Sequence, residues 1–438
     1  MKTSLNCFKI IAFIFLLLFS KGCICPSDSD VYEYHLIKNG FELNEIETEP
    51  GFDKSYVLYI SQPLDHFDSR NRKTFKQKLY LNHRDYSLPM VYETNGYEIK
   101  KGSHTELPDL LQCNEVVIEH RYFGDSVPDS LDWKYLNIKQ AAADQHRVFT
   151  LLKTIYKNSW LLTGISKGGQ TTMYYNYFYP DDMDATVAYV GPLNLKEEDP
   201  KFHEFLRNVG DNKCREKIIN FQRDVLKHKD EIIPLLKKYA AQNNYTFDMR
   251  LEKTLEYAVL EYSFAFWQWA GTDCESIPVN ETDPLLLFDH LTKGSPLSYL
   301  DSANIKRLEP FFYQAYTELG YYNYDLAPFK DLITTISGDF APSKIFAPNY
   351  ESLVSNHKIM LDVNEFIQTN AKNIIFIYGE YDPWSSSAVD LKENTNCLKM
   401  VKEKGSHKTR IKHFDEADRN LIYDKLEEWL GYEIKNKK

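Results

Sequence analysis

The chain has 438 residues, of which 43% are hydrophobic, so its composition supports a large folded core. Its 52 basic and 63 acidic residues give a net charge of −11, which argues against nucleic acid as a partner, because nucleic-acid-binding proteins carry a basic patch or stripe. The length suits one large domain that carries an inserted second domain.

The N-terminal residues have the layout of a secretory signal. Lys2 and Lys9 flank the start of an apolar run over residues 10–20, so a basic region precedes an apolar region, as in such signals. This run is shorter than the ~20 residues of a spanning helix, and no other segment is long and apolar enough to cross a membrane. We therefore expect a signal peptide over residues 1–25 and a secreted, cell-surface or periplasmic protein. Cys23 follows a glycine and is a candidate lipid-anchor site.

Export would place the remaining cysteines in an oxidising compartment. Four of them could form two bridges with three connectivities: Cys113, Cys214, Cys274 and Cys397. A bridge between Cys214 and Cys274 is attractive because both lie in the same later region, and ordinary buried thiols are the alternative. Neither a C-x-x-C pair nor an H-E-x-x-H motif occurs, so we expect no metal site and no cofactor.

The first half of the chain alternates between strand and helix patterns. Strands are expected over residues 54–61, 75–82, 90–94, 114–121, 159–164 and 184–192. Helices are expected over residues 106–112, 138–156 and 168–179, the last of which Pro180 stops. Strands that alternate with helices predict a parallel sheet covered by helices.

The pattern then changes and later returns. Residues 194–355 are mostly helical in period, charged and aromatic. Strands return over residues 373–382 and 397–402, and a helix follows over 418–432. We therefore predict an α/β-hydrolase domain with a large inserted helical cap. The expected boundaries are 26–193 and 356–438 for the two parts of the hydrolase domain and 194–355 for the cap.

A short motif within the first half carries the chemistry. Residues 160–171 read W-L-L-T-G-I-S-K-G-G-Q-T, and residues 164–168 fit G-x-S-x-G. In this motif glycines flank the serine because the backbone turns too sharply for side chains. A chance match occurs in roughly one such chain in twenty, but here a strand precedes the motif and a helix follows it. We therefore expect Ser166 to be a nucleophile.

A nucleophilic serine needs a base and a group that orients the base, in the chain order Ser, Asp or Glu, His. Asp382 follows an apolar strand in G-E-Y-D-P-W, and His407 lies in G-S-H-K between the next strand and the last helix. Loops after the carboxyl ends of parallel strands collect functional residues. We expect Asp382 and His407 to complete a triad, with Glu380 and His413 as the nearest rivals.

The oxyanion hole of this fold needs two backbone N–H groups. The residue after the nucleophile, Lys167, supplies one of them. The other comes from the loop after the strand over residues 90–94, so either Gly96 or Tyr97 is expected there. The alternative for the Asn-Gly pair in that loop is a simple turn, and the two interpretations are compatible.

Several stretches together resemble a known peptidase family. They are Q-P-L-D-H-F at 62–67, E-H-R-Y-F-G-D-S-V-P at 119–128, T-G-I-S-K-G-G at 163–169, F-A-F-W-Q-W at 264–269, Y-D-P-W at 381–384 and G-S-H at 405–407. The chain resembles the secreted serine peptidases typified by bacterial prolyl tripeptidyl and tetrapeptidyl aminopeptidases. It is also similar to the lysosomal Pro-X carboxypeptidase and dipeptidyl peptidase group, which typically has G-G-S-Y-G-G at the serine.

The resemblance implies acylation of Ser166, with short peptides released from an N-terminus after proline. It makes peptides the expected partners and gives no oligomeric state. Aromatic faces pack well on proline, so the cap residues Trp267, Gln268 and Trp269 are candidate pocket walls, with cap core as the alternative. An aminopeptidase also needs an acid for the substrate's ammonium, and the candidates are Glu256, Glu261 and Glu275. Arg121 is expected to be a structural ion-pair partner.

Three other functions are compatible with parts of this pattern. The first is a Pro-X carboxypeptidase-like activity, and the second is a lipase or esterase, because a triad does not fix the acyl group. The third is a secreted binding protein on an inactive hydrolase scaffold. The aromatic and charged character of residues 194–355 favours peptides over fatty acyl groups, and the complete set of triad residues speaks against an inactive scaffold.

Overall fold

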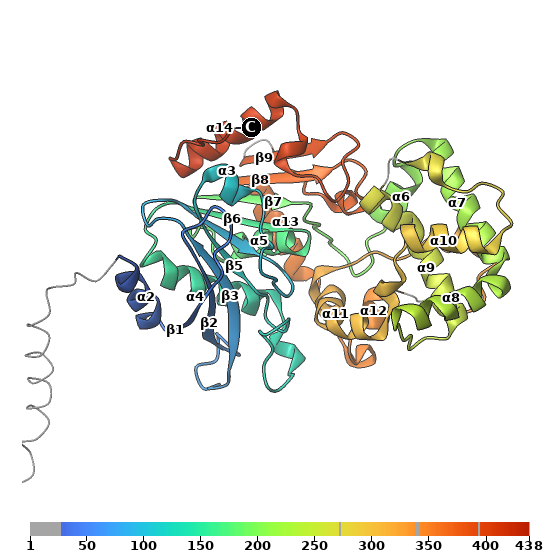
Figure 1. Cartoon of the computed structure of the whole chain (residues 1–438), viewed down its shortest axis with the longest axis horizontal. Helices are drawn as coiled ribbons and strands as arrows, with labels where there is room; N and C mark the ends of the chain where they lie inside the picture. The colour runs from blue at the N-terminus through green and yellow to red at the C-terminus, as the bar shows by residue number, and fades with distance from the viewer. Residues whose placement is uncertain (1–27, 271–272, 338–340, 393–394, 438) are drawn as a thin grey trace, which may run out of the picture.

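The computed structural model describes residues 28–270, 273–337, 341–392 and 395–437. Figure 1 shows a twisted sheet covered by helices and, beside it, a separate group of helices. The predicted signal peptide over residues 1–25 and the candidate anchor site Cys23 lie outside the described residues. No helix within the described ranges has both the length and the apolar character needed to cross a membrane.

The described residues include one nine-stranded sheet with the order β1-β2-β3-β5-β4-β6-β7-β8-β9. Its strands are β1 (Phe41–Ile46), β2 (Lys54–Pro63), β3 (Thr74–His83), β4 (Met90–Thr94), β5 (Asn114–Ile118), β6 (Trp160–Ile165), β7 (Ala185–Tyr189), β8 (Lys372–Gly379) and β9 (Asn396–Lys402). Neighbours from β1 to β5 are antiparallel. Neighbours from β5 to β9 are parallel.

The prediction of a parallel sheet is therefore wrong for its first strands. β2 ends at Pro63 and β3 begins at Thr74, and this short connection has no room for the crossover helix that parallel neighbours require. β1 and the preceding helix α2 (Asp28–Lys38) are additions to the predicted elements. The sheet is mixed because its first part is a meander of antiparallel strands.

Helices cover both faces of the sheet. One apolar core joins the sheet to α4, α5 and α13, and a second joins its other face to α3 and α14. Every residue of β4, β5 and β7 is buried, as expected for strands that are covered on both faces. The helices are α3 (Leu107–Leu111), α4 (Ile138–Lys153), α5 (Lys167–Phe178), α13 (Lys358–Thr369) and α14 (Glu416–Leu430).

Capping side chains define where the longer of these helices begin. The Asn137 side chain accepts a hydrogen bond from the Gln140 backbone N–H at the start of α4. Asp415 does the same for the Asp418 N–H at the start of α14. Both caps satisfy a backbone donor that lacks a partner inside the helix, so the helix starts at residues 138 and 416 follow from local sequence.

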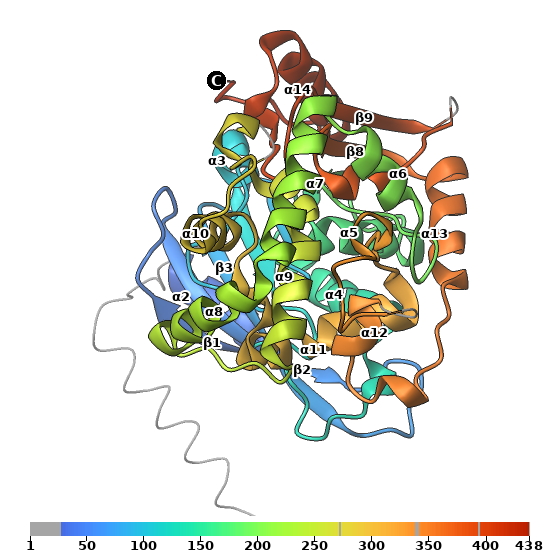
Figure 2. The same cartoon turned by 90° about the vertical axis from the view of Figure 1, so that its right-hand side faces the viewer.

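The second group of helices, α6 to α12, forms its own aromatic-rich core. Figure 2 looks onto this group, in which α7 and α9 lie side by side. We call it the helical segment. Its helices are α6 (Lys201–Asn208), α7 (Asn212–Lys227), α8 (Lys229–Asn243), α9 (Leu251–Ala265), α10 (Pro284–Gly294), α11 (Ser302–Gln314) and α12 (Pro342–Phe346). A π-helical turn over Phe266–Ala270 continues α9.

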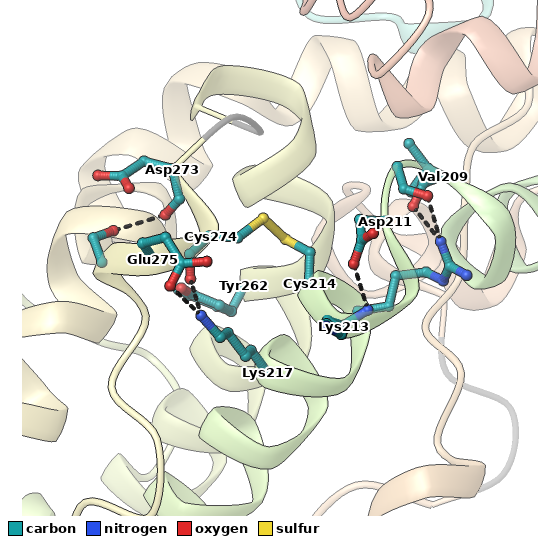
Figure 3. Close-up of a disulfide and its surroundings, with 12 residues drawn as sticks. Val209, Asp211, Lys213, Cys214, Lys217, Tyr262, Asp273, Cys274 and Glu275 are labelled. Carbon is teal, nitrogen blue, oxygen red and sulfur yellow. Dashed lines mark hydrogen bonds and ion pairs between the residues drawn. A yellow bond between two sulfur atoms is a disulfide. The ribbon is translucent and has the colours of Figure 1, made fainter.

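A disulfide joins two parts of the helical segment. It links Cys214 at the start of α7 to Cys274, which follows the end of α9 and its π-helical turn (Figure 3). The pairing expected from the sequence is thus confirmed. Of the other two candidate cysteines, Cys113 is a buried free thiol and Cys397 is a half-buried free thiol.

The parallel half of the sheet brings distant loops to one edge. β4, β6, β8 and β9 run in the same direction, so the loops that follow them begin at the same edge of the sheet. A sharp turn joins β6 to α5 at this edge. The central parallel strands, the covering helices on both faces and this turn identify the α/β-hydrolase fold predicted from the sequence.

Candidate active site

Ser166 occupies the sharp turn between β6 and α5. Its φ of 58° lies in the left-handed region that residues other than glycine rarely adopt. Its backbone N–H donates to the Tyr189 carbonyl at 2.9 Å, which ties the turn to β7. A Cβ on Gly164 would overlap the Gly168 carbonyl, and one on Gly168 would overlap the Thr94 carbonyl. The two glycines therefore allow the strained turn that presents the serine.

Asp382 and His407 form a buried pair at the same edge. His407 Nδ1 lies 2.7 Å from Asp382 Oδ2, and the two residues are 4% and 0% exposed. A carboxylate only accepts hydrogen bonds, so Nδ1 carries the proton and Nε2 is left as the basic nitrogen. The other Asp382 oxygen accepts from the Trp384 backbone N–H at 3.2 Å. The carboxylate is thereby fixed in the orientation that serves the histidine.

The helical segment also holds His407. The His407 backbone N–H donates to the Gln268 carbonyl at 3.0 Å. The Trp269 ring meets the imidazole edge to face, with the ring centroids 5.3 Å apart. Because Gln268 and Trp269 belong to the π-helical turn after α9, the position of this imidazole depends on the helical segment as well as on β9.

The two rival residues lie elsewhere. His413 is exposed, and its Nδ1 accepts from the Arg410 backbone N–H at 2.9 Å. Glu380 is also exposed and accepts from the Lys404 backbone N–H at 2.7 Å. Neither side chain lines the cavity that contains Ser166. The geometry thus pairs Asp382 with His407 rather than either rival.

Ser166 and His407 line a single cavity of about 590 Å³, which is within the range of small-ligand sites. The sheet edge contributes one wall, which includes Tyr97 and Trp384. The helical segment contributes the opposite wall, which includes Trp269 and, from the chain after α11, Tyr321. The cavity therefore lies between the α/β sheet and the helical segment.

The three candidate pocket residues are placed differently. Gln268 and Trp269 line the cavity with Ser166. Trp267 is 2% exposed, meets Tyr381 edge to face at 5.2 Å, and lines a separate cavity inside the helical segment. In the F-W-Q-W stretch, adjacent residues of a helical turn point to different sides, so only part of the stretch faces the substrate space.

Other aromatic residues of the cavity have no role in the sequence prediction. Tyr321 and Trp384 both line it, with their ring centroids 5.6 Å apart. Trp384 lies in the Y-D-P-W stretch directly after Asp382, and Tyr321 opens the run Y-Y-N-Y. Proximity to the orienting aspartate and aromatic density are the sequence signals that point to these residues.

Of the three candidate acids, Glu261 alone lines the cavity. It accepts hydrogen bonds from the Tyr322 hydroxyl at 2.8 Å and the Tyr324 hydroxyl at 2.6 Å. Burial raises the pKa of this carboxyl to about 7, although the two tyrosine hydrogen bonds oppose the rise. Glu261 is therefore a half-buried acid inside the cavity, and its raised pKa means that it changes its charge near neutral pH.

The remaining two acids are engaged outside the cavity. Burial alone would raise the pKa of Glu256, but hydrogen bonds from Thr335 and Thr334 outweigh it and lower that pKa. The Glu256 side chain is fully buried beneath these threonines. Glu275 is an exposed partner of Lys217, 2.8 Å away (Figure 3). Neither acid is placed to meet a substrate bound beside Ser166.

The loop after β4 lies against the turn that carries Ser166. Gly96 has a φ of +83°, and a Cβ there would lie 2.8 Å from the Gly168 backbone nitrogen. The Lys167 side chain crosses to the same loop, and its Nζ donates to the Gly96 carbonyl at 2.6 Å. The Tyr97 carbonyl accepts from the His120 backbone N–H at 3.0 Å. The predicted oxyanion residues thus come together beside the serine.

Arg121 has the structural role expected from the sequence. Its guanidinium is fully buried and lies 2.6 Å from Asp144 Oδ2, while it also donates to the Tyr135 and Leu64 carbonyls. Removing one partner of such a buried pair leaves an uncompensated charge. The pair joins the loop after β5 to α4.

Comparison with known proteins adds independent information about this arrangement. A family model described as PS-10 peptidase S37 matches residues 25–408. The prolyl tri/tetrapeptidyl aminopeptidase of Streptomyces mobaraensis is 31% identical over 416 residues, which cover 93% of this chain and 86% of that protein. The lysosomal Pro-X carboxypeptidase of Mus musculus is 24% identical over 210 residues, covering 43% of this chain and 42% of that protein.

The solved structure of a proline iminopeptidase from Mycobacterium smegmatis aligns with a TM-score of 0.42 and 12% sequence identity. The alignment covers 85% of this chain and 98% of that one. The family match and the Streptomyces relative both extend over most of the chain, and both include the loops that carry Ser166 and Asp382.

Proposed function

The chain belongs to the PS-10 peptidase S37 family and is a serine peptidase; we propose that it is an exopeptidase that releases short peptides from a free N-terminus by cleavage after proline. The acyl-enzyme route uses Ser166 as nucleophile, His407 as base and Asp382 as the group that orients the base. Separate structural observations support each part of this proposal: the requirement for a free N-terminus, the preference for proline and the triad.

Two observations support this chemistry: His407 is bonded to Asp382, and it lines the same cavity as Ser166. His407 Nε2 takes the proton of the Ser166 hydroxyl as the serine oxygen attacks the carbonyl carbon of the scissile bond. The negative oxygen that forms is held by backbone N–H groups of Lys167 and of the Gly96–Tyr97 loop. The imidazolium then gives its proton to the leaving amine, and water releases the acyl group by the same steps.

One observation supports an aminopeptidase most strongly: the half-buried carboxyl of Glu261 shares a cavity with Ser166 and His407. A free N-terminus carries an ammonium group, and a desolvated carboxylate is a strong partner for it. Among the described residues, Glu261 accepts hydrogen bonds from the hydroxyls of Tyr322 and Tyr324, both at Oε2, so Oε1 keeps capacity for another donor. A substrate whose ammonium meets Glu261 can extend only a limited distance before its carbonyl reaches Ser166.

The preference for proline has support from the aromatic walls. Tyr321 and Trp384 line both the main cavity and a small recess that also contains Ser166. A pyrrolidine ring is rigid and apolar, and it packs well on aromatic faces. We place the proline of the substrate against these rings, in the cavity that Trp269 and Gln268 also line.

A carboxypeptidase would instead need a free cation for the substrate's C-terminal carboxylate. The two arginines that line the cavity are engaged. Arg307 pairs with Glu98, and Arg410 donates to the His407 and Thr409 carbonyls. Lys100 and Lys408 line it as exposed residues. The Glu261 carboxyl in this cavity favours recognition of an amine over recognition of a carboxylate, and its charge also disfavours a fatty acyl group.

The wider organisation is part of the proposal. We assign residues 26–193 and 356–438 to the hydrolase domain and residues 194–355 to a cap that restricts entry to short or unfolded chains. The disulfide between Cys214 and Cys274 supports an oxidising compartment, which agrees with a signal peptide over residues 1–25. Secretion, with or without a lipid anchor at Cys23, follows from that signal.

The test compares two forms of one substrate in two enzymes. A fluorogenic Ala-Ala-Pro peptide with a free or an acetylated N-terminus is given to the wild-type protein and to Glu261→Gln. We expect the wild type to prefer the free form by about 100-fold in kcat/KM, since a charge-assisted contact is worth ~1.5–3 kcal/mol. Glu261→Gln should lose most of this preference and keep its rate on the acetylated form. Equal rates of the wild type on both forms would refute the aminopeptidase.

A further inference from the structure

The Lys167 side chain is a buried amine without an acidic partner among the described residues. The residue is 3% exposed, and none of the ion pairs in the described ranges includes it. Its Nζ lies over the rings of Tyr97 and Phe123, 5.4 and 5.1 Å from their centroids. Burial lowers the pKa of this amine well below its usual value. An amine in such a place carries a desolvation cost that an aliphatic side chain would avoid.

The Lys167 amine donates a short hydrogen bond to a backbone carbonyl. Lys167 Nζ lies 2.6 Å from the carbonyl oxygen of Gly96. The nearby histidine, His120, is bonded to the Arg121 carbonyl and the Tyr174 hydroxyl instead. The amine can donate to Gly96 in its protonated or its neutral form, because both forms carry N–H groups.

The Gly96 carbonyl belongs to the peptide group that ends in the Tyr97 N–H. The described residues contain no cis peptide bond, and in a planar trans peptide the C=O and the N–H point in opposite directions. A donor that fixes the Gly96 oxygen on one side therefore fixes the Tyr97 N–H on the other side. A hydrogen bond to the carbonyl also polarises the peptide and strengthens its N–H as a donor.

The surroundings leave this peptide little freedom. Gly96 lies so close to α5 that a Cβ would lie 2.8 Å from the Gly168 nitrogen and 3.0 Å from the Lys167 carbonyl carbon. Tyr97 lines the cavity with Ser166, and Tyr97, Ser166 and Lys167 together line the small recess beside it. The Gly96 side of the peptide, which Lys167 holds, is thus packed against α5, and the next residue, Tyr97, lines the space that contains the reacting serine.

We propose that the Lys167 side chain is a positioning residue that locks the Gly96–Tyr97 peptide so that the Tyr97 N–H becomes the second oxyanion donor. Residue 167 then serves the oxyanion twice. Its own backbone N–H is the first donor, and its side chain aims the second. The inference rests on the acyl transfer proposed above and selects Tyr97 over Gly96 as the donor.

The first test uses Lys167→Met, which keeps the length of the side chain and the backbone N–H but removes the amine. The inhibitor is a peptide aldehyde that ends in prolinal. The Ser166 oxygen adds to the aldehyde carbon, and the former aldehyde oxygen then occupies the oxyanion site. Its affinity and the kcat for the matching substrate should each fall by about 10- to 100-fold, less than the ~10²–10³ for complete loss of one donor. Affinity for the product Ala-Ala-Pro acid, which forms no tetrahedral adduct, should stay within about twofold of wild type.

The matched control is Thr172→Val in the same helix. Thr172 is also buried, and its hydroxyl donates to the Gly169 carbonyl at 2.7 Å, so the variant loses one buried hydrogen bond but leaves the Gly96 carbonyl untouched. We expect its aldehyde affinity and product affinity to stay within about twofold of wild type. Equal loss of aldehyde and product affinity in Lys167→Met would show a merely structural role and overturn the inference.

A second variant does not depend on the stability of Lys167→Met. Replacing Tyr97 by its α-hydroxy acid analogue turns one amide into an ester, which removes the N–H and keeps every side chain. Aldehyde affinity should fall by about 10²-fold or more, and adding Lys167→Met to this ester should cost little further. An ester variant with wild-type aldehyde affinity would overturn the inference.

Turnover of the ester p-nitrophenyl acetate can be measured for the same variants. Failure of the proposed peptidase specificity would appear as absent proline cleavage in the wild-type protein, whereas failure of the Lys167 inference would appear as unchanged ester turnover in both variants.

Discussion

His407 Nδ1 lies 2.7 Å from Asp382 Oδ2, although the two residues are separated by a strand and 25 positions in the chain. This contact fixes which imidazole nitrogen carries the proton. It also requires that β8 and β9 end at the same edge of the sheet, beside the turn after β6. The proposed chemistry of the cavity depends on this pair more than on any other contact between side chains.

The first prediction removes the charge of the orienting group. Asp382→Asn keeps the size of the side chain but offers an amide that can donate to Nδ1, which favours the wrong imidazole tautomer. We expect kcat to fall by about 10⁴-fold with little change in KM. Steady-state kinetics on a fluorogenic proline peptide measure this loss. Glu380→Gln is the matched control, because Glu380 is exposed and, within the described ranges, its side chain bonds the Lys404 N–H alone; a larger loss in the control would move the orienting role to Glu380.

A second prediction separates the two histidines of the last loop. His407→Ala removes the proposed base and should reduce kcat by about 10⁵- to 10⁶-fold. His413→Ala removes an exposed ring that accepts the Arg410 N–H, and its kcat should stay within about threefold of wild type. The two variants need to be compared at equal folded fractions by circular dichroism. If His413→Ala were the more damaged enzyme, the base would be misassigned.

The strained backbone at Ser166 leads to a third prediction. Ser166→Ala and Ser166→Gly should both abolish turnover and labelling by a fluorophosphonate. They should differ in stability, because a φ of 58° costs ~1–3 kcal/mol for a residue with a Cβ, while glycine adds ~0.4–1 kcal/mol of unfolded-state entropy. Urea unfolding should therefore find Ser166→Gly more stable than Ser166→Ala by about 1 kcal/mol. Equal stabilities would show that the turn is relaxed in solution.

The fourth prediction concerns pH and Glu261. Burial raises the pKa of its carboxyl to about 7, so the carboxylate is charged above pH 7 and loses its charge as the pH falls through this value. KM for a peptide with a free N-terminus should therefore rise by roughly tenfold for each pH unit below 7. KM for the acetylated peptide should lack this dependence. The Glu261→Gln variant supplies the control, because its KM for the free peptide should also lose the step near pH 7.

The raised pKa of the Glu261 carboxyl also affects the stability of the folded protein. The folded-state pKa of Glu261 lies above its ordinary value of 4.5, so the folded state holds this proton more tightly than the unfolded state does. The contribution of Glu261 to stability is present below pH 4.5 and is lost as the pH rises to about 7. Glu261→Gln should therefore melt higher than the wild type at pH 8, with a smaller difference at pH 4.5.

The members of the proposed triad could be chosen from the sequence because each follows a recognisable local pattern. Ser166 lies between a strand and a helix in a glycine-flanked turn, and Asp382 follows an apolar strand. His407 precedes the last helix. In a parallel sheet the loops that follow the strands meet at one edge, and this holds for any sequence in the rest of the chain. The antiparallel start of the sheet could have been inferred too, since only ten residues separate Pro63 from Thr74.

The walls of the cavity could not be predicted in the same way. Glu256 and Glu261 both lie on α9, and five residues at 3.6 per turn place them about 140° apart around the helix. The spacing shows that they face different neighbours, but only packing decides which one faces Ser166. Trp267 and Trp269 line different cavities for the same reason. The hydrogen bond from Lys167 to the Gly96 carbonyl likewise depends on two loops that are 71 residues apart.

The most direct test of the whole account is the identity of the products from an unlabelled peptide. A decapeptide with one proline at its third position, with a free or an acetylated N-terminus, is incubated with the purified protein and with Ser166→Ala, and the products are identified by mass spectrometry. We predict that the wild type releases the N-terminal tripeptide from the free form only and that Ser166→Ala releases nothing. Release of the C-terminal residue, or cleavage that proceeds equally well on the acetylated form, would contradict the proposed function.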